Sequence, residues 1–116
     1  VVLCTGKVAW DAMAERTKRN ANVAVVRVEQ LYPFPIAGLR SILATYPNAK
    51  QMVWLQEEPE NMGAWRFVDA IVWPMKNEGY DWRHVARVES GSPATGSKAI
   101  HDQELVDLME QTFAAW

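Results

Sequence analysis

The chain is 116 residues long, with 49% hydrophobic residues, 22% charged residues and a formal net charge of −2. This length fits a single domain over residues 1–116, and the composition excludes wholesale disorder, collagen and disulfide-rich scaffolds. The small net charge gives no electrostatic reason to expect a nucleic acid or an anionic membrane as a partner. No apolar run approaches the about 20 residues that span a bilayer, and the single cysteine, Cys4, cannot form an intramolecular disulfide.

The first third of the chain alternates between apolar runs and a stretch of helical character. A strand is expected at residues 1–4, and a helix from residue 7 to about residue 20 with Thr5 as its N-cap. Residues 23–28 are the clearest strand, and their continuous apolar character is typical of a parallel sheet covered on both faces. The Met-less start in an apolar strand predicts that the chain is a piece of something longer.

The alternation continues to the end of the chain. The middle is expected to hold a helix over 35–46, a strand over 51–56, an acidic loop over 57–61, a helix over 62–72 ended by Pro74 and a polar loop over 76–79. A weaker strand is expected at 81–88, a Gly/Ser/Pro loop at 90–97 and a long helix at 97–115, with an apolar face of Ile100, Leu105, Leu108, Met109, Thr112 and Phe113. This order predicts an α/β fold, a three-layer sandwich with a mostly parallel sheet and helices on both faces.

The loop over residues 91–98 has most of the letters of a phosphate-binding P-loop, but Ser97 and Lys98 are transposed relative to that motif. A one-residue shift rotates the lysine by about 100° around the helix, away from the phosphates. The loop therefore argues against a nucleotide hydrolase. Two interpretations stay open: anion binding by Gly96, Ser97 and Lys98 at a helix N-terminus, or a turn in which Ser97 or Thr95 caps the last helix.

Other candidate sites are weaker. Glu57 and Glu58 are adjacent on an extended segment, so their carboxylates are expected to point to opposite sides and not to converge for acid–base chemistry. They follow a strand of the predicted parallel sheet, where functional loops collect, and a contact with another domain or subunit is favoured over catalysis. Cys4, His84 and His101 lack the spacing of a metal site.

The six tryptophans are more than a small core readily buries. Trp54 and Trp65 are expected to fill the core. The surplus tryptophans, which indicate a partner surface, are Trp10, Trp73, Trp82 and Trp116. No catalytic constellation is visible, so the residues alone describe an α/β domain that docks on another surface.

Several strings resemble a known family closely and in order along nearly the whole chain. They are VLCTGKV at 2–8, RVEQLYPFP at 27–35, YPNAK at 46–50, VWLQEEPENMGAW at 53–65 and SPATG at 92–96. Together they are similar to the C-terminal domain of the thiamine-diphosphate-dependent decarboxylating component of 2-oxoglutarate dehydrogenase. Arg87, Ser90 and His101 also fall where that family often has these residue types, whereas residues 73–89 follow its pattern least.

This resemblance implies a transketolase-like C-terminal fold, with room for one antiparallel edge strand. It implies a parent enzyme that oxidatively decarboxylates 2-oxoglutarate and transfers the succinyl group to a lipoyl arm, with thiamine diphosphate and magnesium bound by upstream domains. The segment alone is then expected to be inert and to bind neither cofactor. The implied partners are those upstream domains, a second subunit in a homodimer and the lipoyl-bearing acyltransferase. The implied compartment is the bacterial cytoplasm, or the mitochondrial matrix in a eukaryote.

Under this interpretation, Glu57, Glu58, Asn61 and Trp65 contact the preceding domain or the second subunit, and no residue of the chain is catalytic. Three alternatives stay open. One is a regulatory module whose loops at 5–7 and 91–98 bind a nucleotide or an acyl-CoA. Another is a stand-alone small enzyme, which the missing constellation disfavours. The third, within the family, is the related 2-oxoadipate enzyme.

Overall fold

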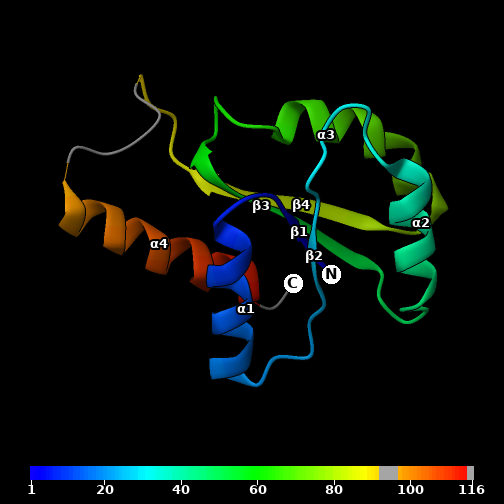
Figure 1. Cartoon of the computed structure of the whole chain (residues 1–116), viewed down its shortest axis with the longest axis horizontal. Helices are drawn as coiled ribbons and strands as arrows, with labels where there is room; N and C mark the ends of the chain where they lie inside the picture. Colours follow the sequence, from blue (N-terminus) through cyan, green and yellow to red (C-terminus); the bar gives the residue numbers. More distant parts are fainter. Residues whose placement is uncertain (92–96, 115–116) are drawn as a thin grey trace.

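The computed structural model describes residues 1–91 and 97–114, which form one parallel sheet between two layers of helices (Figure 1). In chain order the elements are β1 (Val2–Cys4), α1 (Val8–Arg19), β2 (Val25–Arg27), α2 (Ile36–Ala44), β3 (Gln51–Pro59), α3 (Trp65–Val72), the 3₁₀ helix η1 (Trp73–Glu78), β4 (Asp81–Arg87) and α4 (Lys98–Phe113). Among the described residues, no helix is both long and apolar enough to cross a membrane.

The strands lie in the order β2-β1-β3-β4, and every pairing in the described part of the chain is parallel. Val2 of β1 pairs with Val25 on one side and with Val53 on the other. The predicted three-layer α/β fold is therefore confirmed. The antiparallel edge strand allowed by the family resemblance is wrong for the described residues, because β4 at that edge runs parallel to β3.

The two faces of the sheet are covered by different helices (Figure 1). On one face, α1 and α4 enclose an aliphatic core. It is made of Val2, Cys4, Val8, Ala9, Ala12, Val53, Leu55, Val85, Leu108 and Met109. On the other face, α2, α3 and η1 enclose a core that contains two tryptophans. It is made of Leu3, Val28, Leu39, Leu43, Met52, Trp54, Trp65, Val68, Val72 and Met75. We call these the aliphatic face and the aromatic face.

Several element boundaries differ from the prediction. The clearest strand of the sequence, at 23–28, is only three residues long and half-buried, because β2 lies at the edge of the sheet. β3 extends to Pro59 through an irregular pairing with β4, so Glu57 and Glu58 belong to the strand and not to a loop. The next helix accordingly begins at Trp65 instead of residue 62.

Local details also differ. The N-cap of α1 is Lys7 and carries no side-chain cap, so Thr5 does not cap the helix. The expected polar loop at 76–79 is mostly the 3₁₀ helix η1, and Pro74 lies in its first turn, where proline is tolerated. Ile100 is exposed near the start of α4, outside the buried stripe of Leu108, Met109 and Thr112.

Candidate functional site

The carboxyl ends of β1 and β3 lie side by side at one edge of the sheet, and the chain leaves them toward opposite faces. The segment after β1 leads to α1 on the aliphatic face, and the segment after β3 leads to α3 on the aromatic face. In open parallel sheets, functional loops collect at such a switch point. The polar side chains at this edge therefore form the candidate functional site.

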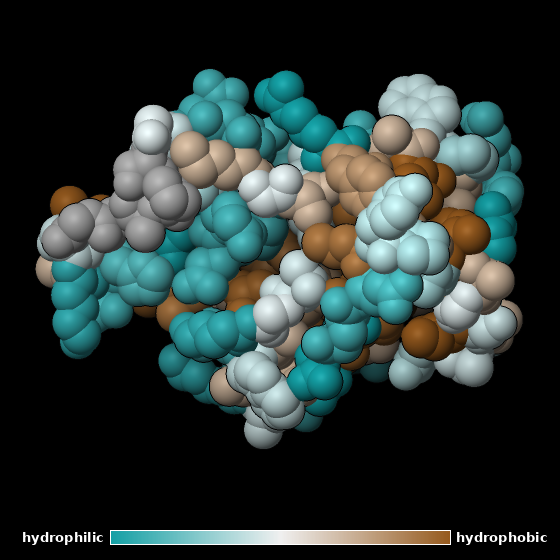
Figure 2. Space-filling view, turned by 45° about the horizontal axis from the view of Figure 1, so that its top comes forward, coloured by the Kyte–Doolittle hydropathy of each residue, from teal (hydrophilic) through white to brown (hydrophobic). Residues whose placement is uncertain are grey.

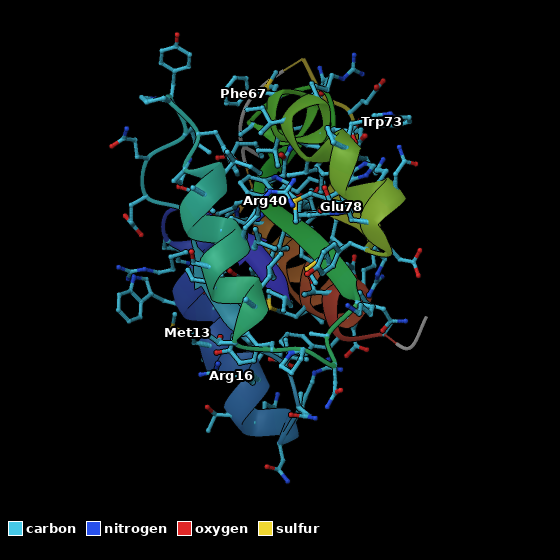
Figure 3. All side chains as sticks on the ribbon, turned by 90° about the vertical axis from the view of Figure 1, so that its right-hand side faces the viewer. Met13, Arg16, Arg40, Phe67, Trp73 and Glu78 are labelled. Atoms are coloured by element: carbon cyan, nitrogen blue, oxygen red, sulfur yellow. The ribbon has the colours of Figure 1, made fainter. Side chains whose placement is uncertain are left out.

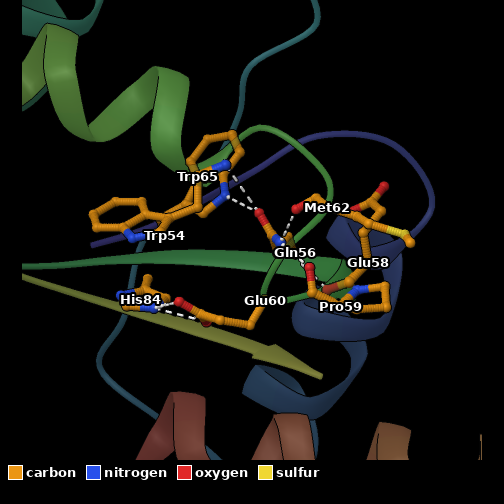
Figure 4. A network of polar contacts seen from close by, with 8 residues as sticks. All are labelled: Trp54, Gln56, Glu58, Pro59, Glu60, Met62, Trp65 and His84. Atoms are coloured by element: carbon orange, nitrogen blue, oxygen red, sulfur yellow. Dashed lines mark hydrogen bonds and ion pairs between the residues drawn. The ribbon is translucent and has the colours of Figure 1, made fainter. Parts of the chain in front are cut away.

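Gln56, close to the end of β3, is the centre of a buried hydrogen-bond network (Figure 4). The residue is 2% exposed. Its Oε1 accepts from the Trp54 indole at 3.1 Å and from the Trp65 backbone N–H at 3.0 Å. Its Nε2 donates to the backbone carbonyls of Glu58 at 3.3 Å, Pro59 at 3.0 Å and Met62 at 2.7 Å. One neutral side chain thus joins the end of β3 to the start of α3.

Gly63 closes this network from the solvent side. Its φ of +73° lies in the left-handed region, which favours glycine. A Cβ at this position would stand 3.0 Å from Gln56 Nε2, so a larger residue at 63 would crowd the Gln56 amide and strain the backbone.

His84 extends the aromatic face toward the same edge. Its ring stacks on Trp65, with 4.6 Å between ring centroids and 16° between the planes. Its Nε2 lies 2.8 Å from both carboxylate oxygens of Glu60, which follows β3 directly (Figure 4). The Trp65 ring therefore stacks on a His84 imidazole that Glu60 holds in place.

Arg87, at the end of β4, is the corresponding centre on the aliphatic face. Its side chain is 4% exposed. Nε donates to the Glu57 carbonyl at 2.7 Å, and Nη1 donates to the carboxylate of Glu104 and to the His101 carbonyl at 3.5 Å. The Glu57 carboxylate lies 3.9 Å from Arg87 Nη2 and 3.7 Å from His101 Nε2. This buried guanidinium ties α4 to β3.

Asn61 joins the segments that follow β3 and β4. Its side-chain amide donates to the Ser90 carbonyl at 2.9 Å and accepts from the Ser90 N–H at 3.0 Å, as a paired strand residue would. The Glu60 N–H adds a bond to the Arg87 carbonyl at 2.7 Å. The segments that follow β3 and β4 are thereby held together beyond the end of the regular sheet.

Glu57 and Glu58 point to opposite faces, as predicted: Glu57 lies beside Arg87, and Glu58 lines a hollow on the aromatic face. The hollow has a volume of about 420 Å³ and is lined by Thr5, Leu31, Tyr32, Trp54, Glu58, Gly63, Ala64 and Phe67. Of the four predicted contact residues, Trp65 is buried, Asn61 bonds Ser90 and Glu57 borders Arg87, whereas the side chain of Glu58 is exposed.

The predicted anion-binding residues fall at the start of α4. Ser97 is the N-cap and accepts from the Ile100 N–H at 3.4 Å, which confirms the capping interpretation. Lys98 pairs with Asp102 at 3.5 Å on the exposed side of the helix. Gly96 and Thr95 lie outside the described residues.

Ionisable groups near β1 include two side chains with shifted pKa values, Cys4 and Lys7. Burial raises the pKa of the Cys4 thiol to about 12, so the thiol is protonated at neutral pH. The hydrogen bond from Lys7 to Asp11, at 2.8 Å, raises the pKa of Lys7. Lys7 is thus engaged within α1. Among the described residues, no three His, Cys, Asp or Glu side chains are grouped as metal ligands.

Two of the four tryptophans predicted to lie outside the core are exposed on the surface. Trp10 is 60% exposed and Trp73 is 59% exposed, whereas Trp82 is half-buried and Trp116 lies outside the described residues. Figure 2 shows polar and apolar side chains interspersed, with the broader brown area toward the side that carries α2 and α3.

Figure 3 views the end of the molecule that carries α2 and η1. Arg40 of α2 faces Glu78 of η1, and Trp73 and Phe67 lie toward the outside. The hydrogen bond from Arg40 lowers the pKa of Glu78. This exposed pair links the two helices across the surface.

Sequence reasoning did not single out Gln56, it considered His84 only as a metal ligand, and it noted Arg87 only through the family resemblance. A signal for Gln56 was present: it shares a strand face with Met52 and Trp54, so a polar side chain at that position falls on a buried register. Such a side chain needs hydrogen-bond partners.

Comparisons with known proteins agree with one another. A family model described as 2-oxoglutarate dehydrogenase C-terminal matches residues 1–113. A 2-oxoglutarate dehydrogenase E1 component from Cupriavidus necator is 43% identical over 115 residues, which are 98% of this chain and 12% of that protein. Those of an Exiguobacterium species and of Rickettsia prowazekii are 36% and 41% identical, with 98% and 94% of this chain covered. The chain thus spans 12% of the length of each of these three relatives.

Proposed function

The chain belongs to the 2-oxoglutarate dehydrogenase C-terminal family, and from this premise we propose that it is the assembly domain of an E1 component. In that role it joins the rest of the polypeptide and helps to hold two subunits together. The observation that carries the proposal is the use of the polar residues at the switch-point edge. Gln56, Arg87 and Asn61 form their hydrogen bonds within the chain itself and make a rigid edge, while Tyr32, Phe67 and Glu58 near this edge are exposed.

The chemistry of the parent enzyme is part of this proposal, and the names of the relatives support it. It is the oxidative decarboxylation of 2-oxoglutarate with transfer of the succinyl group to the lipoyl arm of an acyltransferase. The relatives are named for 2-oxoglutarate, which favours it over 2-oxoadipate. They come from bacteria, which supports the bacterial cytoplasm as the compartment.

Magnesium, which together with thiamine diphosphate would supply the decarboxylation chemistry, does not fit the carboxylates at this edge. Magnesium takes oxygen ligands in a near-octahedral arrangement. Three carboxylates at the switch-point edge are instead engaged within the chain: Glu57 and Glu104 lie beside Arg87, and Glu60 lies beside His84. We therefore place both cofactors in parts of the enzyme outside this domain.

The regulatory alternative gains no support from the geometry. Ser97 is occupied as a helix cap, Lys98 pairs with Asp102, and Lys7 pairs with Asp11. These residues stabilise the helices in which they lie.

The test uses the full-length enzyme with Trp65→Ala, and with Trp65→Phe as the matched control. Trp65 packs in the aromatic core, so loss of its ring destabilises this domain by about 3–5 kcal/mol. We expect Trp65→Ala to lower the dimer fraction in sedimentation velocity while the affinity for thiamine diphosphate, measured by calorimetry on the remaining dimer, stays unchanged.

The Trp65→Phe variant keeps most of the packing and is expected to dimerise normally. Limited proteolysis reports whether the domain has opened. Intact dimers in a Trp65→Ala sample whose C-terminal domain is cleaved rapidly would show that the domain does not support assembly.

A further inference from the structure

The hollow beside Glu58 is a concave surface lined mainly by apolar and aromatic residues, with one carboxylate. Its volume of about 420 Å³ lies in the range of sites for small ligands and exceeds the volume of a single side chain. Buried Trp54 is among its lining residues, and Tyr32 and Phe67 stand exposed beside it. These residues come from β3, from the segment between β2 and α2, and from α3.

The rim of the hollow has two aromatic rings. Tyr32 is 83% exposed, and its ring centroid lies 6.5 Å from that of Phe67 with the planes tilted by 49°. The two faces therefore form an open corner. Aromatic faces attract a cation placed within about 6 Å of the ring centroid, and a guanidinium also stacks on them.

The hollow also has one negative charge. In the part of the chain that the structure describes, the Glu58 carboxylate has no hydrogen bond or ion pair, unlike Glu57 and Glu60. Its lining residues include no lysine or arginine. A free carboxylate beside aromatic rings suits a cation with an apolar stem, whereas an anion would be repelled and a purely apolar group would leave the carboxylate without a partner.

Resting on the proposed function, we propose that this hollow binds an arginine or lysine side chain, together with an adjoining apolar residue, from another domain of the same full-length polypeptide. The volume accommodates both side chains. We assign these side chains to another domain because the segment that matches this chain is only 12% of the length of each of the three relatives. Most of the polypeptide that an assembly domain must contact therefore lies outside this chain.

The test places a photoreactive benzoylphenylalanine at Tyr32 in the full-length enzyme. Position 32 is exposed on the rim, so the probe keeps an aromatic ring and reaches whatever enters the hollow. We expect irradiation to yield one main cross-linked peptide, from another domain of the same polypeptide and with an arginine or lysine beside an apolar residue. Glu58→Lys should lower the cross-link yield about tenfold or more, because it places like charges together.

Glu58→Gln keeps the shape of the side chain and should lower the yield less than Glu58→Lys. Glu89→Gln is the matched control, since Glu89 is also an exposed carboxylate and lies outside the hollow; it should leave the yield unchanged. A yield independent of the charge at position 58, a captured peptide without a basic residue, a captured peptide from a different protein, or no cross-link would each overturn the proposal.

The outcome is separable from that of the proposed function. If Trp65→Ala leaves dimers intact, the assembly role fails, whatever position 32 captures. If Trp65→Ala dissociates the dimer but the cross-link ignores the charge at position 58, the assembly role stands and the basic partner is wrong.

Discussion

On both faces of the sheet, a buried polar side chain fixes the chain where the strands end, but the two side chains differ in charge. The aromatic face ends in a neutral amide, Gln56, with five hydrogen bonds to protein groups. The aliphatic face ends in a charged guanidinium, Arg87, between two carboxylates. A neutral centre needs only geometry, whereas a buried charge must also be compensated against desolvation. We therefore expect the Gln56 centre to depend less on salt than the Arg87 centre.

The largest effect is expected from Gln56→Leu. The substitution conserves volume but leaves the Trp54 indole, the Trp65 N–H and three backbone carbonyls without their partner. Because each buried group left unsatisfied costs about 1–3 kcal/mol and the sites relax in part, we expect a loss of about 3–5 kcal/mol, measured by urea unfolding.

Gln51→Leu is the control for this substitution. Gln51 lies in the same strand and is exposed, so its replacement should change stability by less than about 0.5 kcal/mol. Equal effects at the two positions would remove the special role given to Gln56.

An intermediate effect is expected from Arg87→Met. The variant leaves Glu57 and Glu104 facing each other without the cation, and both carboxylates still reach water in part. We therefore expect a loss of about 2–3 kcal/mol, below the 3–5 kcal/mol typical of a fully buried broken pair. The loss should shrink in high salt, because salt screens the repulsion between the carboxylates.

Arg66→Met provides the matched control, since Arg66 is an exposed arginine on α3. It should be nearly neutral in urea unfolding. A salt-independent loss in Arg87→Met would mean that packing and not charge dominates the aliphatic edge, and the contrast between the faces would fail.

The smallest effect concerns Cys4 in the aliphatic core. Its pKa is raised by burial from an ordinary value of 9.0 to about 12 in the folded protein. Above pH 9 the unfolded chain loses the thiol proton while the folded chain keeps it, so the folded state binds more protons and stability falls as pH rises toward 12.

We expect the stability of the unmodified chain to fall relative to Cys4→Ala by about 1 kcal/mol between pH 9 and pH 10. Urea unfolding at several pH values measures the difference, and a disulfide reagent should modify the thiol only after unfolding. Parallel stability curves for the two proteins would show that the aliphatic core admits the thiolate.

Much of the fold was predictable because period-2 and helical patterns are local. Alternation alone placed Glu57 and Glu58 on opposite faces, and the structure confirms it. The edge position of β2 was not predictable, because Val25 and Val26 look like an interior strand and only the strand order shows that one side is open.

The site was predictable only in part. Ser97 as a helix cap follows from local sequence. The pairing of Arg87 with Glu104 and of His84 with Trp65 joins residues 17 and 19 positions apart on different elements. No local pattern encodes such contacts, since they arise from the register of β4 and the placement of α4. Asn61 and Trp65 stay predictions as contacts with another domain.

The central place of β1 has a consequence for synthesis on the ribosome. β1 is the first strand of this domain to be synthesised, yet it pairs with β3 about 50 residues later, and the aliphatic core that covers it is completed only by α4. Contacts of such long separation form slowly. Val2, Cys4 and the buried side of α1 therefore stay open to chaperones until residues 98–113 have left the exit tunnel.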